Sequence, residues 1–177
     1  MATALYERQE NVVVDNRAGK YLTFCLGKEE FAVRVLHVRE IIGIQDITTV
    51  PQTPACIKGV INLRGKVIPV VDLRLKFGMP EQAHTERTCI IVIQVEGAAG
   101  AMNTGIIVDE VSEVLNLSGS EIEPTPDFGD GADTPYLLGL AKVKDKVKIL
   151  LDIGQVLKDQ ELSGMPALLE GNGASSL

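Results

Sequence analysis

Aromatic and basic side chains are scarce in this sequence. Tryptophan is absent, and aromatic residues make up 4% of the 177 residues. Proteins that bind single-stranded nucleic acids stack the bases on aromatic rings, and this chain has few rings to offer. Lysine and arginine number 17 against 24 acidic residues, which gives a formal net charge of −7. Because phosphate backbones attract clustered basic residues, the composition argues against a nucleic-acid partner.

Long apolar runs and cysteine motifs are lacking as well. No stretch approaches the roughly 20 apolar residues that a membrane helix needs, and residues 1–17 are too polar for a signal peptide. We therefore expect no direct insertion into a membrane. Cys25, Cys56 and Cys89 occur without a C-x-x-C pattern, which is typical of buried thiols in a reducing cytoplasm. The share of hydrophobic residues, 45%, is enough for a folded core.

Catalytic and metal-binding patterns are missing too. His37 and His84 have no second histidine or cysteine at metal-ligand spacing. Residues 59–66 superficially resemble a phosphate-binding loop, but they lack its serine or threonine and run into a predicted strand. Asp109 and Glu110 follow a predicted strand, where exposure to solvent explains both carboxylates. Because an enzyme needs convergent groups with tuned pKa values, we expect no catalytic residue, no metal and no cofactor.

The chain contains a hidden repeat. A shift of 80 residues superposes part of the first half on the second, with Gly59 on Gly139 and Asp72 on Asp152. A shift of 73 residues does the same further upstream, with Glu40 on Glu113. Chance similarity between two β-rich halves is the alternative. The matched glycine, glutamate and aspartate residues favour a duplication.

Each repeat has the same predicted order: two strands, a short helix, a short strand, two more strands and a short helix. In the first half the predicted strands cover residues 21–26, 31–35, 47–50, 57–63 and 66–71, and the predicted helices cover 35–42 and 73–77. In the second half the strongest strand covers residues 88–95, before a predicted loop at 97–103. Five short strands with short connections suit a small closed barrel. The sequence therefore predicts a mainly β protein of two five-stranded barrels packed side by side, with short helices.

The predicted boundaries follow the two halves of the repeat. The first barrel occupies residues 19–86, and the second occupies residues 87–162. Flexible tails are expected at residues 1–18 and 163–177. An exchange of strands between the halves stays open, because both halves have the same pattern.

One polar segment interrupts an otherwise apolar pair of strands. Asn62 and Arg64 lie where two predicted strands meet. A polar turn explains them, and so does an arginine presented at a surface by a rigid scaffold, where its planar donor fork suits protein recognition. The second repeat has Lys142 and Lys144 at the corresponding positions. This divergence favours a function specific to the first half.

The same segment carries a resemblance to a known family. Residues 57–65, Ile-Lys-Gly-Val-Ile-Asn-Leu-Arg-Gly, followed by residues 67–74, closely resemble the CheW family of bacterial chemotaxis adaptors. Residues 38–41 and 107–115 also match stretches of that family, and the resemblance extends across about residues 20–160. It implies two SH3-like barrel subdomains and no enzymatic activity.

The resemblance also implies partners and contact residues. Proteins of this family tie the cytoplasmic hairpins of methyl-accepting chemoreceptors to the regulatory domain of the histidine kinase CheA. By resemblance, the receptor-binding residues are Val38, Glu40, Gly59, Asn62, Arg64 and Val67. The kinase-binding residues are expected among Ile106, Val108, Lys142 and Lys144. The chain would then be cytoplasmic and associated with receptor arrays at the inner face of the membrane.

Other functions stay open at this point. A CheW-like adaptor could serve a twitching or another non-flagellar pathway, because the sequence does not say which receptors are cognate. Ile42 stands where many relatives carry arginine, which leaves the exact receptor partner open. The same fold could be a unit of a larger protein, such as the regulatory end of a kinase or an adaptor fused to a receiver. A barrel that binds a small molecule in the seam between the subdomains is a further alternative.

Overall fold

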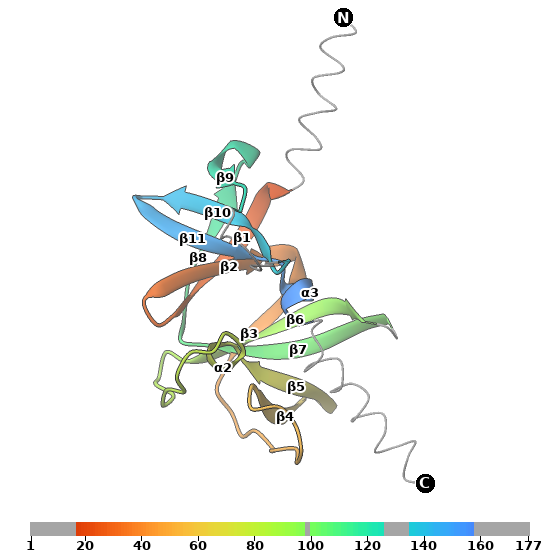
Figure 1. Cartoon of the computed structure of the whole chain (residues 1–177). Coiled ribbons are helices and arrows are strands. Elements are labelled where there is room, and N and C mark those ends of the chain that lie inside the picture. Colours follow the sequence, from red (N-terminus) through yellow and green to blue (C-terminus); the bar gives the residue numbers. More distant parts are fainter. Residues whose placement is uncertain (1–16, 98–99, 126–134, 158–177) are drawn as a thin grey trace, which may run out of the picture.

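The computed structural model describes residues 17–97, 100–125 and 135–157, and β-strands dominate them (Figure 1). The strands are β1 (Gly19–Leu26), β2 (Glu29–Arg34), β3 (Val38–Gly43), β4 (Ile57–Leu63), β5 (Lys66–Asp72), β6 (Cys89–Gly97), β7 (Gly100–Val108), β8 (Glu110–Leu117), β9 (Ile122–Glu123), β10 (Leu137–Val143) and β11 (Lys146–Leu151). Short helical segments connect them: η2 (Val35–His37), α2 (Leu73–Lys76), η3 (Gly119–Glu121) and α3 (Ile153–Val156). The mainly β fold is confirmed. The predicted tails, 1–18 and 163–177, lie outside the described residues except for residues 17 and 18.

The strands form two sheets of matching design. One sheet has the order β3-β6-β7-β5-β4, and the other has the order β8-β1-β2-β11-β10-β9. In each sheet one neighbouring pair is parallel, β5–β7 in the first and β2–β11 in the second. With their helices the sheets are the two SH3-like subdomains, here called subdomain 1 (β3–β7 and α2) and subdomain 2 (β1, β2, β8–β11 and α3). They lie side by side, subdomain 2 above subdomain 1 in Figure 1.

Strand pairing differs from the predicted division at residue 86. The β1–β2 hairpin from the first half pairs with β8 and β11, and the β6–β7 hairpin from the second half pairs with β3 and β5. Each half of the repeat thus supplies a hairpin to the sheet of the other half. Subdomain 1 takes its described residues from the single stretch 38–108, and subdomain 2 takes them from 19–34 and from 110–125 and 135–157. Sequence pattern could not choose between the arrangements, because the two hairpins have similar apolar strands.

The repeat is visible in the backbone itself. The elements β4, β5 and α2 recur 80 residues later as β10, β11 and α3. Gly59 and Gly139 both have positive φ, +143° and +158°, and both lie at a register shift in their strand pair. A Cβ atom at Gly59 would lie 2.0 Å from the carbonyl oxygen of Thr48, and one at Gly139 would lie 2.6 Å from that of Glu123. Glycine is therefore needed at both positions, because a neighbouring backbone segment leaves no room for a Cβ atom.

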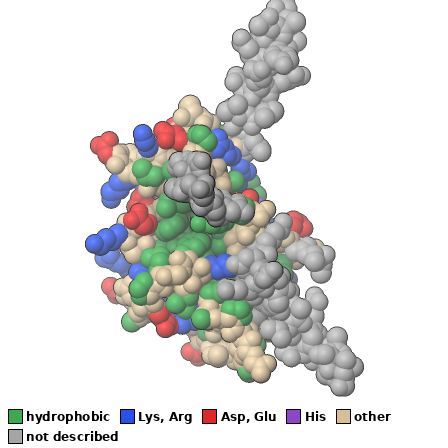
Figure 2. All heavy atoms as spheres, viewed as in Figure 1, with side chains coloured by type: hydrophobic (Ala, Val, Ile, Leu, Met, Phe, Trp, Pro, Cys, Tyr) green, Lys and Arg blue, Asp and Glu red, His purple; other side chains and the backbone are tan. Residues whose placement is uncertain are grey.

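The inner strands are buried on both faces. Along β6, Ile90 and Val92 face the interior of subdomain 1, whereas Ile91 and Ile93 face the seam between the subdomains. The seam cluster also takes buried residues from subdomain 2, including Phe24 of β1. Figure 2 shows the apolar side chains gathering between the two subdomains. Burial on both faces explains why the predicted strands are apolar runs rather than alternating patterns.

The predicted helix at residues 35–42 is wrong. Only η2 is helical there, and β3 follows it at once as a strand paired with β6. The apolar residues Val38, Ile41 and Ile42 matched a helical period by spacing, but β-branched side chains favour extended backbone. The predicted loop at 97–103 is also wrong in part, because β7 begins at Gly100. The short strand predicted at 47–50 is reduced to one bridge, between Thr48 and Val60.

A buried ion pair joins the exchanged β1–β2 hairpin to the rest of subdomain 2. Lys148 of β11 is 4% exposed and donates to the carboxylate of Glu30 on β2. The corresponding positions on β7 and β5 hold Asn103 and Ile68, which carry no charge. The pair therefore belongs to the β2–β11 contact alone among the two parallel contacts.

Gly59→Ala should destabilise the protein by at least about 2 kcal/mol, because the new methyl group meets backbone and the positive φ is strained. Denaturant unfolding would measure the loss. Gly43→Ala is the matched control, since Gly43 lies in β3 with no atom within 4 Å of its added Cβ. Equal stability of the two variants would contradict the requirement for glycine at residue 59.

Lys148→Met should cost about 3 kcal/mol, because it leaves the Glu30 carboxylate without its partner in a largely buried position. Adding Glu30→Gln removes the unpaired charge and should recover most of the loss. Denaturant unfolding of the wild type and of both variants checks this. A double variant that is no more stable than Lys148→Met would contradict the ion-pair explanation.

Candidate functional site

The turn between β4 and β5 presents Arg64 on a rigid base. Arg64 and Gly65 have φ values of +52° and +86°, which are typical of a tight two-residue hairpin. The Asn62 side-chain oxygen accepts a hydrogen bond of 2.8 Å from the Gly65 amide and stabilises the turn. The Arg64 side chain is 73% exposed. Asn62 is thus a turn-forming residue, and Arg64 is the residue that the turn displays.

A bidentate ion pair orients the Arg64 side chain. Its two terminal nitrogens donate to the two carboxylate oxygens of Glu40 at 2.9 and 2.7 Å. Glu40 lies on β3, at the opposite edge of the sheet from β4, so the pair also joins the two sheet edges. The hydrogen bonds and the charge of Glu40 raise the pKa of Arg64. The arginine fork is therefore held in place before any partner arrives.

The remaining predicted receptor-binding residues divide into surface and interior. Val67 is 58% exposed and lies opposite Asn62 across the β4–β5 pair. Val38 lies two residues before Glu40 and is half-buried against the seam cluster. Gly59 is buried, so it supports the hairpin and offers no surface. The structure brings together Glu40, Asn62, Arg64 and Val67, here called the corner.

Sequence reasoning missed two exposed apolar side chains that are close to Glu40 in the sequence. Ile41, next to Glu40 on β3, is exposed, and so is Leu36 in η2. The alternation of half-buried and exposed residues along β3 would have placed Ile41 outside, had the segment been interpreted as a strand. The helical interpretation put Ile41 on the buried face instead.

The predicted kinase-binding residues need a correction. Ile106 and Val108 of β7 are fully buried, because β7 is an inner strand of subdomain 1 that packs into the seam. Their side chains therefore offer nothing to a partner. Lys142 and Lys144 are exposed on the β10–β11 hairpin of subdomain 2. Lys144 has a φ of +52°, the same value as Arg64, so it occupies the equivalent turn position.

Subdomain 2 lacks the corner's ion pair among its described residues. Lys142 pairs with Glu123 at 3.6 Å, and both side chains are exposed. The exposed valines Val114 and Val147 occupy the repeat positions of Ile41 and Val67. Each subdomain therefore exposes apolar side chains at two equivalent positions, but among the described residues only subdomain 1 adds an arginine held by a carboxylate.

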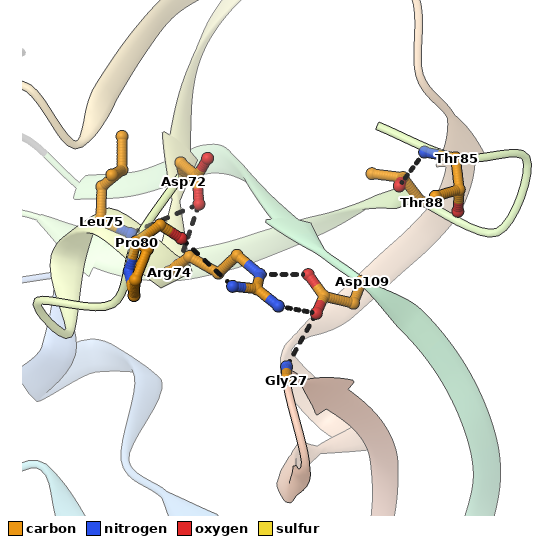
Figure 3. A network of polar contacts seen from close by, with 8 residues as sticks. All are labelled: Gly27, Asp72, Arg74, Leu75, Pro80, Thr85, Thr88 and Asp109. Carbon is orange, nitrogen blue, oxygen red and sulfur yellow. Dashed lines mark hydrogen bonds and ion pairs between the residues drawn. The ribbon is translucent and has the colours of Figure 1, made fainter. Parts of the chain in front are cut away.

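Asp109 forms a polar junction between the subdomains (Figure 3). It is the single residue between β7 and β8. Its carboxylate accepts hydrogen bonds from Nε and a terminal nitrogen of Arg74 at 2.8 and 2.7 Å, and from the Gly27 amide at 2.7 Å. Its own amide donates to the Cys25 carbonyl at 3.0 Å. The prediction that Asp109 lies at a solvent-exposed strand end is therefore wrong. The sequence could not show this, because Arg74 and Asp109 meet only in the tertiary structure.

Comparison with known proteins agrees with this architecture. A family model described as a CheW-like domain matches residues 20–161. The chain belongs to the CheW family. It is 40% identical over 144 residues to chemotaxis protein CheW of Klebsiella aerogenes, covering 81% of this chain and 84% of the relative. A more distant relative, protein FrzA of Myxococcus xanthus, is 30% identical over 123 residues, with 70% of this chain and 74% of FrzA covered.

A solved CheW structure has the same fold. The scaffolding protein TtCheW from Thermoanaerobacter tengcongensis superposes with a TM-score of 0.71 at 33% identity, covering 81% of this chain and 95% of that chain. Within the described ranges of our CheW-family chain, no group of three or more His, Cys, Asp or Glu side chains could hold a metal ion. The same residues include no helix with the length and apolar character to span a membrane.

Asp109 should make stability depend on acid pH. Partial burial acts to raise the pKa of Asp109, but the hydrogen bonds from Arg74 and Gly27 and the charge of Arg74 together hold it below its ordinary value. The contribution of Asp109 is therefore complete above the unfolded pKa of about 3.9 and is lost as the pH falls through the lower folded pKa. We expect Asp109→Asn to cost about 2 kcal/mol near pH 7, with a difference from wild type that shrinks towards pH 3.

Unfolding free energies of both proteins between pH 7 and pH 3 test this dependence. Glu110→Gln is the neighbouring control, because Glu110 meets Arg87 only in an exposed pair at 3.8 Å. A difference for Asp109→Asn that stays constant down to pH 3 would contradict the role of its charge.

Proposed function

We propose that this chain is a non-enzymatic adaptor of a bacterial chemotaxis system. It would couple the cytoplasmic hairpins of methyl-accepting chemoreceptors to the regulatory domain of a CheA-type histidine kinase. The observation that carries this proposal is membership of the CheW family across residues 20–161. The adaptor would work in the cytoplasm, at receptor arrays on the inner face of the membrane.

The corner is the proposed receptor contact. Arg64 uses two of its five N–H donors on Glu40, which leaves three for acceptors on a receptor helix. Because the turn and Glu40 already order the side chain, binding loses little conformational entropy there. Val67 adds exposed apolar surface opposite Asn62, which a helix can cover with one of its faces. A polar anchor beside apolar contacts suits recognition of an amphipathic helix.

Subdomain 2 is the proposed main kinase contact. It exposes Lys142 and Lys144 on the β10–β11 hairpin, and it exposes Val114 and Val147 at the repeat positions of Ile41 and Val67. Two barrels of similar shape can pack through exposed apolar side chains, and exposed lysines can steer an acidic partner. Receptor and kinase would then occupy different subdomains of one adaptor.

A second candidate is an adaptor of a non-flagellar sensory pathway. The similarity to a protein with a different name, FrzA, favours keeping this candidate beside the first. Both candidates share the fold and the corner, and they differ in the cognate receptors. Binding of receptor fragments from each sensory operon of the same organism would distinguish them.

Arg64→Ala should weaken binding of a chemoreceptor cytoplasmic fragment about thirtyfold, which corresponds to about 2 kcal/mol for the loss of an interface anchor. Isothermal titration of the fragment measures this effect. Lys144→Ala is the matched control, because residue 144 has the same backbone conformation in the other subdomain. Its receptor affinity should match the wild type.

Kinase binding and unfolding stability provide the second control. Both should change little in Arg64→Ala, because the side chain is exposed and the turn is kept. Receptor affinity that is the same in Arg64→Ala and in the wild type would remove Arg64 from the receptor contact.

A further inference from the structure

We propose that Asp109 and Arg74 are positioning residues that hold the two subdomains at one angle and so transmit the receptor signal across the adaptor. The inference rests on the proposed function, because it assumes receptor contact on subdomain 1 and kinase contact on subdomain 2. Neither residue needs to touch either partner. Their role would be to transmit a displacement of one subdomain to the other.

Three elements meet at the Asp109 carboxylate. Arg74 comes from α2 of subdomain 1, the Gly27 amide comes from the β1–β2 turn of subdomain 2, and Asp109 itself connects β7 to β8 (Figure 3). The chain crosses from one sheet to the other within this one residue. The subdomains therefore cannot rotate at this point without straining the hydrogen bonds of Asp109.

The Asp109 junction is largely sheltered from solvent, and further hydrogen bonds fix the position of Arg74. The side chains of Arg74 and Asp109 are 12% and 29% exposed, so water competes weakly for their charged hydrogen bonds. Asp72 accepts from the Arg74 amide and orients the start of α2. Arg74 also donates to the Pro80 carbonyl at 3.1 Å, which secures the segment that leads towards β6.

One rigid strand connects the corner to the junction. β5 begins at Lys66, directly after the Arg64–Gly65 turn, and it ends at Asp72, the residue that caps α2. Its length is roughly 20 Å at the usual rise per residue. A shift of the turn on receptor binding would move β5, and with it Arg74, relative to Asp109. This chain of contacts is a physical route by which the corner can be coupled to the Asp109 junction.

The apolar seam cannot replace the junction. Apolar contacts hold the subdomains together but have no preferred direction, and packed layers can slide by small shear movements. Hydrogen bonds from a planar guanidinium to a carboxylate are directional and define an angle. Among the described residues, Arg87 and Glu110 form the other ion pair between the subdomains, at 3.8 Å with side chains 69% and 45% exposed. An exposed pair of this kind contributes little.

The test separates binding from transmission. Arg74→Met keeps the apolar stem and removes the guanidinium, and Arg87→Met is the matched control at the exposed pair. With the full-length adaptor, titrations give the affinities for the receptor fragment and for the kinase. A reconstituted assay gives receptor-dependent kinase activation with every component saturating. We expect Arg74→Met to keep both affinities within threefold but to lose at least tenfold in activation, with Arg87→Met like the wild type.

A distance measurement reports the angle directly. Spin labels introduced without cysteine chemistry at Lys66 and Asn116, both exposed on strands of different subdomains, give a distance distribution by double electron–electron resonance. We expect a single narrow distribution in the wild type and a broader or shifted one in Arg74→Met. Asp109→Asn, which keeps the shape of the side chain, should broaden it in the same direction and guards against a folding failure of the first variant.

Two results would overturn the proposal. One is unchanged activation in Arg74→Met, and the other is an unchanged distance distribution in both junction variants. If the wild-type adaptor binds neither receptor nor kinase, the proposed function fails. The distance distribution would still decide whether the Asp109 junction fixes the angle.

Discussion

Burial of single strands on both faces is the constraint on which this structure depends. Strands such as β6 supply one row of side chains to the interior of their own barrel and the next row to the seam. The subdomains are therefore not independent folding units, because side chains of their central strands pack into one shared core. The exchange of hairpins strengthens this union, since each half of the repeat finishes the sheet of the other.

The corner and the Asp109 junction both lie where the backbone leaves the sheets. The corner lies at a hairpin turn, where left-handed backbone and a glutamate on the far sheet edge orient one arginine. The Asp109 junction lies at the crossing between sheets, where a carboxylate gathers donors from both subdomains. Both sites use a bidentate arginine–carboxylate pair: the Arg64 side chain is exposed at the turn, and the Arg74–Asp109 pair is largely sheltered between the subdomains.

The matching design of the two subdomains makes their differences informative. Arg64 and Lys144 share a backbone conformation, yet only Arg64 has a carboxylate partner across the barrel among the described residues. The β2–β11 contact has a buried charge pair that the β5–β7 contact replaces by neutral residues. Among the described residues, only subdomain 1 thus has an arginine held by a carboxylate at its turn, and only subdomain 2 has a charged contact with its exchanged hairpin. Such a division suits an adaptor that presents a different face to each partner.

Local pattern in the sequence was sufficient for the strands, the repeat and the Arg64 turn, because strand periodicity, glycine and turn-forming residues act over a few neighbours. It failed at residues 35–42, where apolar spacing fitted two periods and pairing with β6 decided for a strand. It also could not foresee the burial of Ile106 or the partner of Asp109, since both depend on segments far away in the chain. The sequence by itself determined most of the strands, the internal repeat and the family. Only tertiary structure decided which hairpin completes which sheet and which charges meet, because similar strands can pair in more than one way until the whole core is packed.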